Sequence, residues 1–129
     1  WDIHGSNSST SAMQKRMHDF KRLRPYYYGD YYPLTGNDNL LRDDRWLAYQ
    51  MDRPGQGDGI IMAFRRKNCN SESLTVMLRG LDLKETYEII DEDSGIKFNK
   101  TGQELALGFT LNLSEKPGSL LIIYKKHNT

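Results

Sequence analysis

The chain has 129 residues, a formal net charge of +1 and a hydrophobic content of 37%. This length suits one ordinary domain, which buries roughly two thirds of the surface of its unfolded chain. The hydrophobic content excludes a disordered tail, and the balanced charge gives no basic surface of the kind that binds nucleic acid. We therefore expect one folded domain without a nucleic-acid partner.

The number of cysteines, the spacing of the histidines and the length of the apolar runs exclude several further classes of protein. Cys69 is the single cysteine, so the fold cannot rest on an internal disulfide. The histidines His4, His18 and His127 are scattered, without the spacing of zinc ligands. No apolar run approaches the roughly 18 residues of a membrane-spanning helix. The sequence thus predicts no cofactor, no metal and no membrane partner, and it gives no indication of the compartment.

Residues 12–23 are predicted to form a helix. Ser11 and Gln14 match a capping box, in which two side chains satisfy free amides at a helix start. Pro25 disfavours helical geometry at Arg24 and should end the helix there. One apolar stripe at helical spacing is formed by Met13, Met17, Phe20 and Leu23. Such a stripe is typical of core packing rather than of a cofactor site.

An aromatic segment follows this helix. Five tyrosines lie between residues 26 and 32, bracketed by Pro25 and Pro33. Each proline fixes its φ angle and each ring offers a large face, so the segment presents flat surfaces on a restricted backbone. Two interpretations stay open: the rings pack two structural units together, or they stack on the faces of sugars. The residues that would contact sugar are Tyr27, Tyr28, Tyr31, Tyr32 and Trp46.

From residue 46 onward the hydrophobic period becomes two, and turn residues recur at intervals of about ten. Predicted strands lie at residues 46–52, 60–66, 74–79, 87–91, 96–98, 109–114 and 119–125. The run at 120–124 is apolar on both faces, which places this strand at the centre of a sheet. About seven to eight short strands predict a mainly β fold, an antiparallel β-sandwich preceded by one α-helix.

Neighbouring carboxylates do not make a catalytic pair in this sequence. Glycoside hydrolysis needs two carboxyl groups that face each other across about 5–10 Å. Asp43 with Asp44 and the run at 91–93 are adjacent in the chain, where side chains diverge or point to water. The run at 91–93 also fails as a calcium loop, because Gly95 and Gly102 stand where oxygen ligands are needed. We therefore predict no catalytic residue and no metal ligand.

Several segments, spread over nearly the whole chain, carry a family resemblance. They are Met17–Arg24 with the Tyr-Gly-Asp-Tyr-Tyr-Pro-Leu run, Trp46–Gln50 with Asp52-Arg53-Pro54, Gly59–Arg66, Leu78–Asp82 with Tyr87-Glu88-Ile89, Thr101–Leu105, and Pro117–Ser119 with Tyr124-Lys125. Leu83 departs from the pattern, since proline is common there. In this order the segments resemble the end of the melibiase-type α-galactosidases of glycoside hydrolase family 36, where the last helix of the catalytic barrel leads into a C-terminal β-domain.

The resemblance implies a parent enzyme that hydrolyses terminal α-galactosides by a retaining mechanism. In such enzymes a (β/α)8 barrel carries an aspartate nucleophile and an aspartate acid/base, which would lie upstream of Trp1, so no catalytic residue is carried over. The chain would divide into residues 1–35, the last barrel helix and aromatic linker of a truncated catalytic domain, and residues 36–129, the C-terminal antiparallel β-domain. Its partner would be the parent's own barrel, and the isolated chain is expected to be inactive.

Two functions from different classes follow from these observations. The first is a structural role, in which the domain covers apolar barrel surface and stiffens the enzyme. The alternative is a carbohydrate-binding module that grips α-galactoside sugars through residues 26–32 and Trp46. A binding platform leaves at least two rings coplanar and open, whereas packing buries them. A protein-interaction module would instead show one large apolar patch. Without its barrel neighbours, the apolar helix stripe should pack back on the β-domain, pair with another chain or stay loosely held.

Overall fold

A computed structural model describes residues 22–36 and 44–127 of the chain. Most of the predicted helix at 12–23 lies outside these residues, including three members of its apolar stripe. Arg22 and Leu23 form a helical turn that continues through Pro25 as the 3₁₀ helix η1 (Arg24–Tyr28). The α-helical conformation ends at Leu23, as expected from Pro25. The 3₁₀ helix that follows was not expected; the proline stands in its first turn, where the missing N–H loses no partner.

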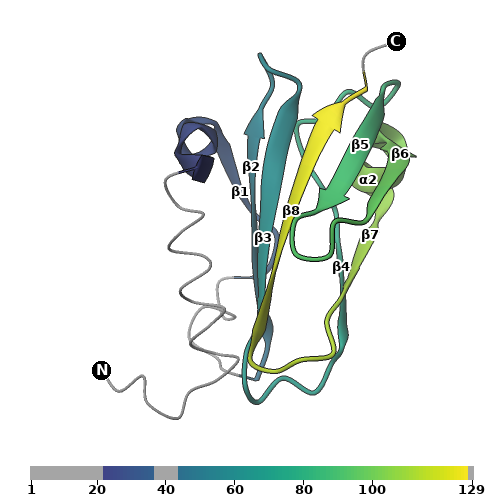
Figure 1. Ribbon diagram of the computed structural model, residues 1–129. Helices are drawn as coiled ribbons and strands as arrows, with labels where there is room; N and C mark the ends of the chain where they lie inside the picture. Colours follow the sequence, from purple (N-terminus) through teal and green to yellow (C-terminus); the bar gives the residue numbers. More distant parts are fainter. Residues whose placement is uncertain (1–21, 37–43, 128–129) are drawn as a thin grey trace.

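Eight strands in the described residues form two antiparallel sheets (Figure 1). The large sheet has the order β1-β2-β3-β8-β5-β6, and the small sheet pairs β4 with β7. The large sheet contains β1 (Asp30–Pro33), β2 (Trp46–Arg53), β3 (Asp58–Arg65), β5 (Thr86–Asp91), β6 (Lys97–Thr101) and β8 (Gly118–Lys126). The small sheet contains β4 (Ser73–Val76) and β7 (Phe109–Asn112), and the short helix α2 (Gly102–Leu107) leads from β6 to β7. The expected mainly β, antiparallel architecture is confirmed.

The apolar strand β8 is central, as its sequence predicts. It pairs with β3 on one side and β5 on the other, so Tyr124 lies opposite both Gly59 and Ile89. Leu120, Ile122 and Tyr124 belong to the core between the sheets, and Leu121 belongs to the apolar cluster on the opposite face, so both faces of the strand are buried and apolar. β2 and β3 form a hairpin whose turn contains Gly57 at φ 70°, a left-handed conformation that glycine adopts without steric cost.

The main core lies between the two sheets. Along β2 every second side chain, beginning at Trp46, is buried on this side. Val76, Phe109 and Leu111 reach it from the small sheet and pack in the same cluster as Ala48. Two opposed sheets that share one apolar interior make a β-sandwich.

The side of the large sheet that faces away from the small sheet, here called the outer face, is also apolar. Ile60 and Leu121 are buried there, and Leu23 covers them with only 1% of its own surface exposed. Tyr26 and Tyr27 pack on the same cluster. Figure 1 shows η1 standing beside the large sheet, on the side away from β4 and β7. Three outcomes were expected for the apolar helix stripe. For Leu23 the structure shows the first of them, because this residue packs back on the β-domain.

Two elements differ from the sequence-based expectation. Asp30–Pro33, expected to be part of a linker, is the edge strand β1, where Pro33 can be accommodated because an edge strand leaves some N–H positions unpaired. Gly102–Leu107, for which no element was expected, is the helix α2. The domain boundary after residue 35 stays a prediction, although β1 on its N-terminal side pairs with β2 on its C-terminal side.

Candidate functional site

Tyr27 and Tyr28 are neighbours on η1 but lie in different surroundings. The Tyr27 ring packs on the outer face, and its hydroxyl donates to Met62 Sδ at 3.7 Å. The Tyr28 side chain is 82% exposed. Next to them, the Arg53 guanidinium lies 4.1 Å from the centroid of the Tyr26 ring, a cation–π contact that holds η1 to the end of β2.

Tyr31 and Tyr32 point to opposite faces of β1, as successive strand residues must. Tyr31 lies on the outer face, where its ring centroid is 5.9 Å from that of Tyr49. Tyr49 in turn lies 6.1 Å from Phe64. We call Tyr31, Tyr49 and Phe64 the ring row. Tyr32 points the other way, with the Arg79 guanidinium 5.7 Å from its ring centroid.

Trp46 belongs to the core between the sheets. Only 3% of its surface is exposed, and its indole N–H donates to the carbonyl oxygen of Ser71 at 2.9 Å. Its ring therefore offers no face to a ligand in this structure. The five residues proposed from the sequence as sugar contacts are thus not brought together on one surface. The rings of Tyr28 and Tyr31 remain open, and sugar contact through them stays a prediction.

A buried polar network that the sequence analysis missed joins three strand residues. The Tyr124 hydroxyl donates to Asp52 Oδ1 at 2.6 Å and accepts from Gln50 Nε2 at 2.8 Å. The same Gln50 amide donates to the Arg79 carbonyl at 2.7 Å and accepts from the Arg79 N–H at 2.8 Å. Gln50 therefore ties the segment after β4 to the interior of the large sheet.

The electrostatics of this network follow from its burial. Removal from water raises the pKa of the Tyr124 phenol far above its ordinary value, and the hydrogen bond to Asp52 raises it further. Burial also raises the pKa of the Asp52 carboxyl, although the hydrogen bond from Tyr124 opposes this shift. Asp52 is 3% exposed, and its Oδ2 has no hydrogen-bond partner among the described residues.

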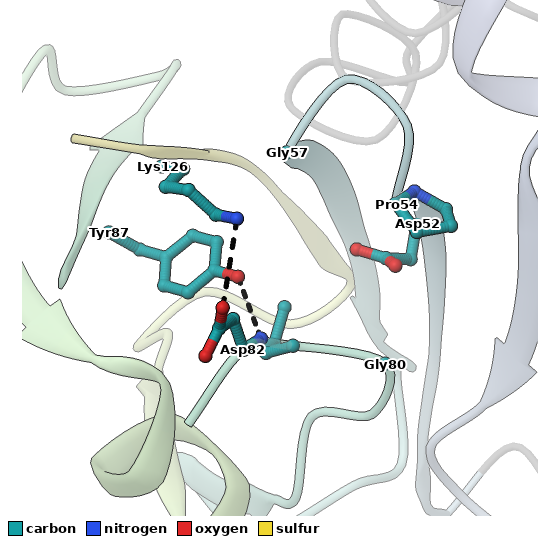
Figure 2. A pocket seen from close by; sticks show the side chains of 8 residues that line it. Asp52, Pro54, Gly57, Gly80, Asp82, Tyr87 and Lys126 are labelled. Atoms are coloured by element: carbon teal, nitrogen blue, oxygen red, sulfur yellow. Dashed lines mark hydrogen bonds and ion pairs between the residues drawn. The ribbon is translucent and has the colours of Figure 1, made fainter. Parts of the chain in front are cut away.

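A pocket of about 330 Å³ opens next to Asp52. We call it the Asp52 pocket; its lining residues are Asp52, Pro54, Gly57, Gly80, Leu81, Asp82, Tyr87 and Lys126. Figure 2 shows the Asp52 carboxylate on the β2 side, across the pocket from Tyr87 and Lys126. Lys126 Nζ lies 3.9 Å from Asp82 Oδ2, and the Tyr87 hydroxyl accepts from the Asp82 N–H at 2.9 Å. The pocket thus combines acceptors, a cationic donor and one aromatic ring.

Across 22–36 and 44–127, no three His, Cys, Asp or Glu side chains gather as they would around a metal ion. No helix in these ranges is both long enough and apolar enough to cross a bilayer.

Comparison with known proteins shows which solved structures share this fold. No protein-family model and no curated protein matches the sequence. Among solved structures, the galactosidase domain of the α-galactosidase–sucrose kinase AgaSK matches 97% of this chain, with 19% identity and a TM-score of 0.66. A variant of the GH36 α-galactosidase AgaA from Geobacillus stearothermophilus, in complex with 1-deoxygalactonojirimycin, matches 98%, with 21% identity and a TM-score of 0.67. The chain has the fold of a GH36 α-galactosidase domain.

The match covers 17% of the length of each of those two chains, as expected for one domain of a larger protein. The resemblance inferred from the sequence motifs is therefore confirmed at the level of the fold. In this GH36-like domain, the sequence pattern of β2 did indicate that Gln50 and Asp52, the β2 members of the polar network, are buried. Gln50 and Asp52 continue the period-two series that starts with Trp46 and Ala48, so both had to point into the core.

Proposed function

We propose that this chain is a non-catalytic, structural domain of a larger glycoside hydrolase, attached through its N-terminal segment to a (β/α)8 catalytic barrel. The parent would hydrolyse terminal α-galactosides by a retaining mechanism. Two observations support the proposal: the fold matches 17% of the length of GH36-type α-galactosidase chains, and the outer face of the large sheet is built to hold an aromatic, helical segment.

The outer face supports the proposal because a strand with one face in water normally alternates apolar and polar residues. Here Ile60 and Leu121 are covered by Leu23, which by itself contributes about 2 kcal/mol of apolar burial. Tyr26 and Tyr27 extend this contact, and their hydroxyls keep polar partners at the seam. A sheet with apolar residues on both faces fits a domain that joins a second structural unit.

The first test is a hydrolysis assay of the purified chain with a chromogenic α-galactoside. We expect no turnover, because the proposal places the catalytic aspartates on the barrel. Turnover that co-purifies with the chain and disappears in Asp52→Asn would overturn the structural role and move catalysis into the Asp52 pocket. Turnover that Asp52→Asn leaves intact would equally contradict the proposal and would identify another site.

One observation favours the alternative of a carbohydrate-binding module: the exposed rings of Tyr28 and Tyr31, the latter in the ring row. Tyr31 and Tyr49 are inclined by 40°, so their faces do not form one flat platform. Titration of the isotope-labelled chain with melibiose and raffinose, followed by backbone amide shifts, separates the two functions. Saturable shifts at Tyr28, Tyr31 and Tyr49 that Tyr31→Ala removes would favour the module. Well-dispersed peaks without such shifts would favour the structural role.

A further inference from the structure

The Asp52 pocket holds a buried acceptor that the fold does not use. Asp52 Oδ1 is satisfied by the Tyr124 hydroxyl, but Oδ2 has no donor among the described residues, although only 3% of the residue is exposed to solvent. A buried carboxylate oxygen without a donor is costly. The protein therefore gains from any ligand that brings a hydrogen-bond donor to this oxygen.

Gly80 lines the pocket next to Oδ2. Its φ of 77° is left-handed, and a β-carbon there would stand 2.9 Å from Asp52 Oδ2 and 3.3 Å from the Tyr32 hydroxyl. Since glycine has no side chain, the space beside these two polar atoms stays free of a β-carbon. Oδ2 is shielded from solvent, so a ligand hydroxyl can reach it only if the chain around it moves.

The remaining groups define the charge of a suitable ligand. A free cation would meet Lys126, and a free anion would meet Asp82 and Asp52. Lys126 and Asp82 already neutralise each other across 3.9 Å. A neutral ligand leaves this pair intact and brings no uncompensated charge into a half-closed site.

Hydroxyl groups fit this mixture because each can both donate and accept. One hydroxyl can donate to Asp52 while others accept from Lys126 and donate to Asp82. The Tyr87 ring, Pro54 and the glycine backbone supply apolar surface for the carbon skeleton. We propose that the Asp52 pocket binds a neutral polyhydroxy compound of monosaccharide size, with Asp52 Oδ2 as the hydroxyl acceptor at its floor.

This site is separate from the ring row: Asp52 faces the interior between the sheets, whereas Tyr31 and Tyr49 lie on the outer face. It also does not depend on the structural role proposed above. Failure of one proposal is therefore distinguishable from failure of the other.

The test is a titration of the isotope-labelled 129-residue chain with galactose, glucose and glycine, each followed by backbone amide shifts. We expect saturable shifts with at least one of the two sugars, centred on Gly57, Gly80 and Lys126, and none with glycine. Asp52→Asn replaces the free acceptor with an amide donor and should weaken sugar binding at least about tenfold.

Lys126→Met supplies a second variant that leaves the polar network untouched, and it should also weaken binding several-fold. Its matched control is Lys125→Met, since Lys125 is exposed and points to the opposite face of β8. Shifts centred on Tyr31 and Tyr49, shifts with glycine alone, or no saturable shift with either sugar at tens of millimolar would each overturn the proposal. So would equal weakening by the two lysine variants.

Discussion

Tyr124 lies where three strands meet, and the residues around it are constrained by its hydroxyl. Gly59 is opposite Tyr124 on β3, and a β-carbon at Gly59 would collide with that hydroxyl and with the Met51 carbonyl. The glycine is required here for close approach rather than for a special backbone angle. Asp52 and Gln50 then satisfy the buried hydroxyl from β2.

Replacement of Gly59 by alanine should destabilise the domain by at least about 2 kcal/mol, because a filled core has no room for the methyl group. Chemical denaturation of the purified variant measures this change. Gly55→Ala is the matched control: nothing lies within 4 Å of the position that a β-carbon would take there, so its stability should stay close to that of the wild type. Equal stability of Gly59→Ala and the wild type would contradict the geometry.

Asp52 should make the stability of the domain depend on pH in a specific direction. Burial raises its pKa, so the native state binds a proton more tightly than the unfolded chain does. The free energy of unfolding therefore falls as pH rises from the ordinary carboxyl range through the raised pKa. Asp52→Asn keeps an acceptor for Tyr124 and removes this titration.

The stability of the wild type relative to Asp52→Asn should consequently increase as the solution is made more acidic. Urea unfolding of both proteins at about pH 4 and about pH 7 measures the difference. A difference that is constant with pH, or one that shrinks in acid, would show that the native pKa of Asp52 is not raised.

Arg65 is a third buried polar residue that the sequence did not single out, after Gln50 and Asp52. Its guanidinium donates to the carbonyl oxygens of Cys69, Leu113 and Ser114 at distances of 2.9–3.1 Å. A planar fork with five N–H donors can reach two loops at once. The segment after β3 and the segment after β7 are thus held together by one side chain.

Arg65→Lys should destabilise the domain by about 2 kcal/mol, because the smaller donor set leaves buried carbonyl groups unpaired. Thermal unfolding followed by circular dichroism provides the measurement. Lys67→Arg, at an exposed position nearby, is the control and should change little. A wild-type melting temperature for Arg65→Lys would show that the two loops do not depend on the guanidinium.

Among the elements, α2 forms because its first turn is capped from both directions. Thr101 Oγ1 accepts from the Glu104 N–H at 3.1 Å, and Glu104 Oε1 accepts from the Thr101 N–H at 2.9 Å. The Thr101 N–H and the Thr101 hydroxyl both donate to the Glu104 carboxylate, and these two hydrogen bonds lower the pKa of Glu104. The capping pattern Thr-x-x-Glu was visible in the sequence, but a six-residue helix has no apolar period long enough to predict.

Thr101→Ala should cost about 1 kcal/mol of stability, and Thr101→Ser should restore most of it, because serine supplies the same capping oxygen. Amide hydrogen exchange at Leu105 reports on α2 itself. Leu105 is fully buried and its carbonyl accepts from the Leu78 N–H, so faster exchange should spread to the segment after β4. Unchanged exchange in Thr101→Ala would show that packing of Leu105, and not the cap, holds the helix.

In the molecule as a whole, two apolar layers share the large sheet. The core between the sheets occupies one side, and Leu23 with the rings of η1 occupies the other. The salt bridge between Arg22 and Glu92, at 2.9 Å, ties the same segment to the chain after β5. The N-terminal segment is therefore part of the β-domain's packing from residue 22 onward.

Leu23→Ala should release this segment while the sandwich remains folded. The cost is about 2–4 kcal/mol if the cavity does not collapse. Hydrogen exchange should accelerate at Gly29, whose N–H bonds to the Tyr26 carbonyl, but stay slow at Ile61, which lies on β3 between β2 and β8. Arg24→Ala, at an exposed position, is the control. Simultaneous loss of protection at Ile61 would mean that the outer layer supports the whole sandwich.

The class of fold could be predicted from the sequence, because the period-two alternation from Trp46 onward and the apolar run of β8 depend only on which side chains must leave water. The ordered motifs likewise carried the resemblance to GH36 α-galactosidases. The use of the tyrosines could not be predicted in this way. Tyr31 and Tyr32 diverge because residues 30–33 pair with β2, a contact between distant segments that no local pattern encodes. For the same reason only the folded chain brings Asp52, Gly80 and Lys126 to one pocket.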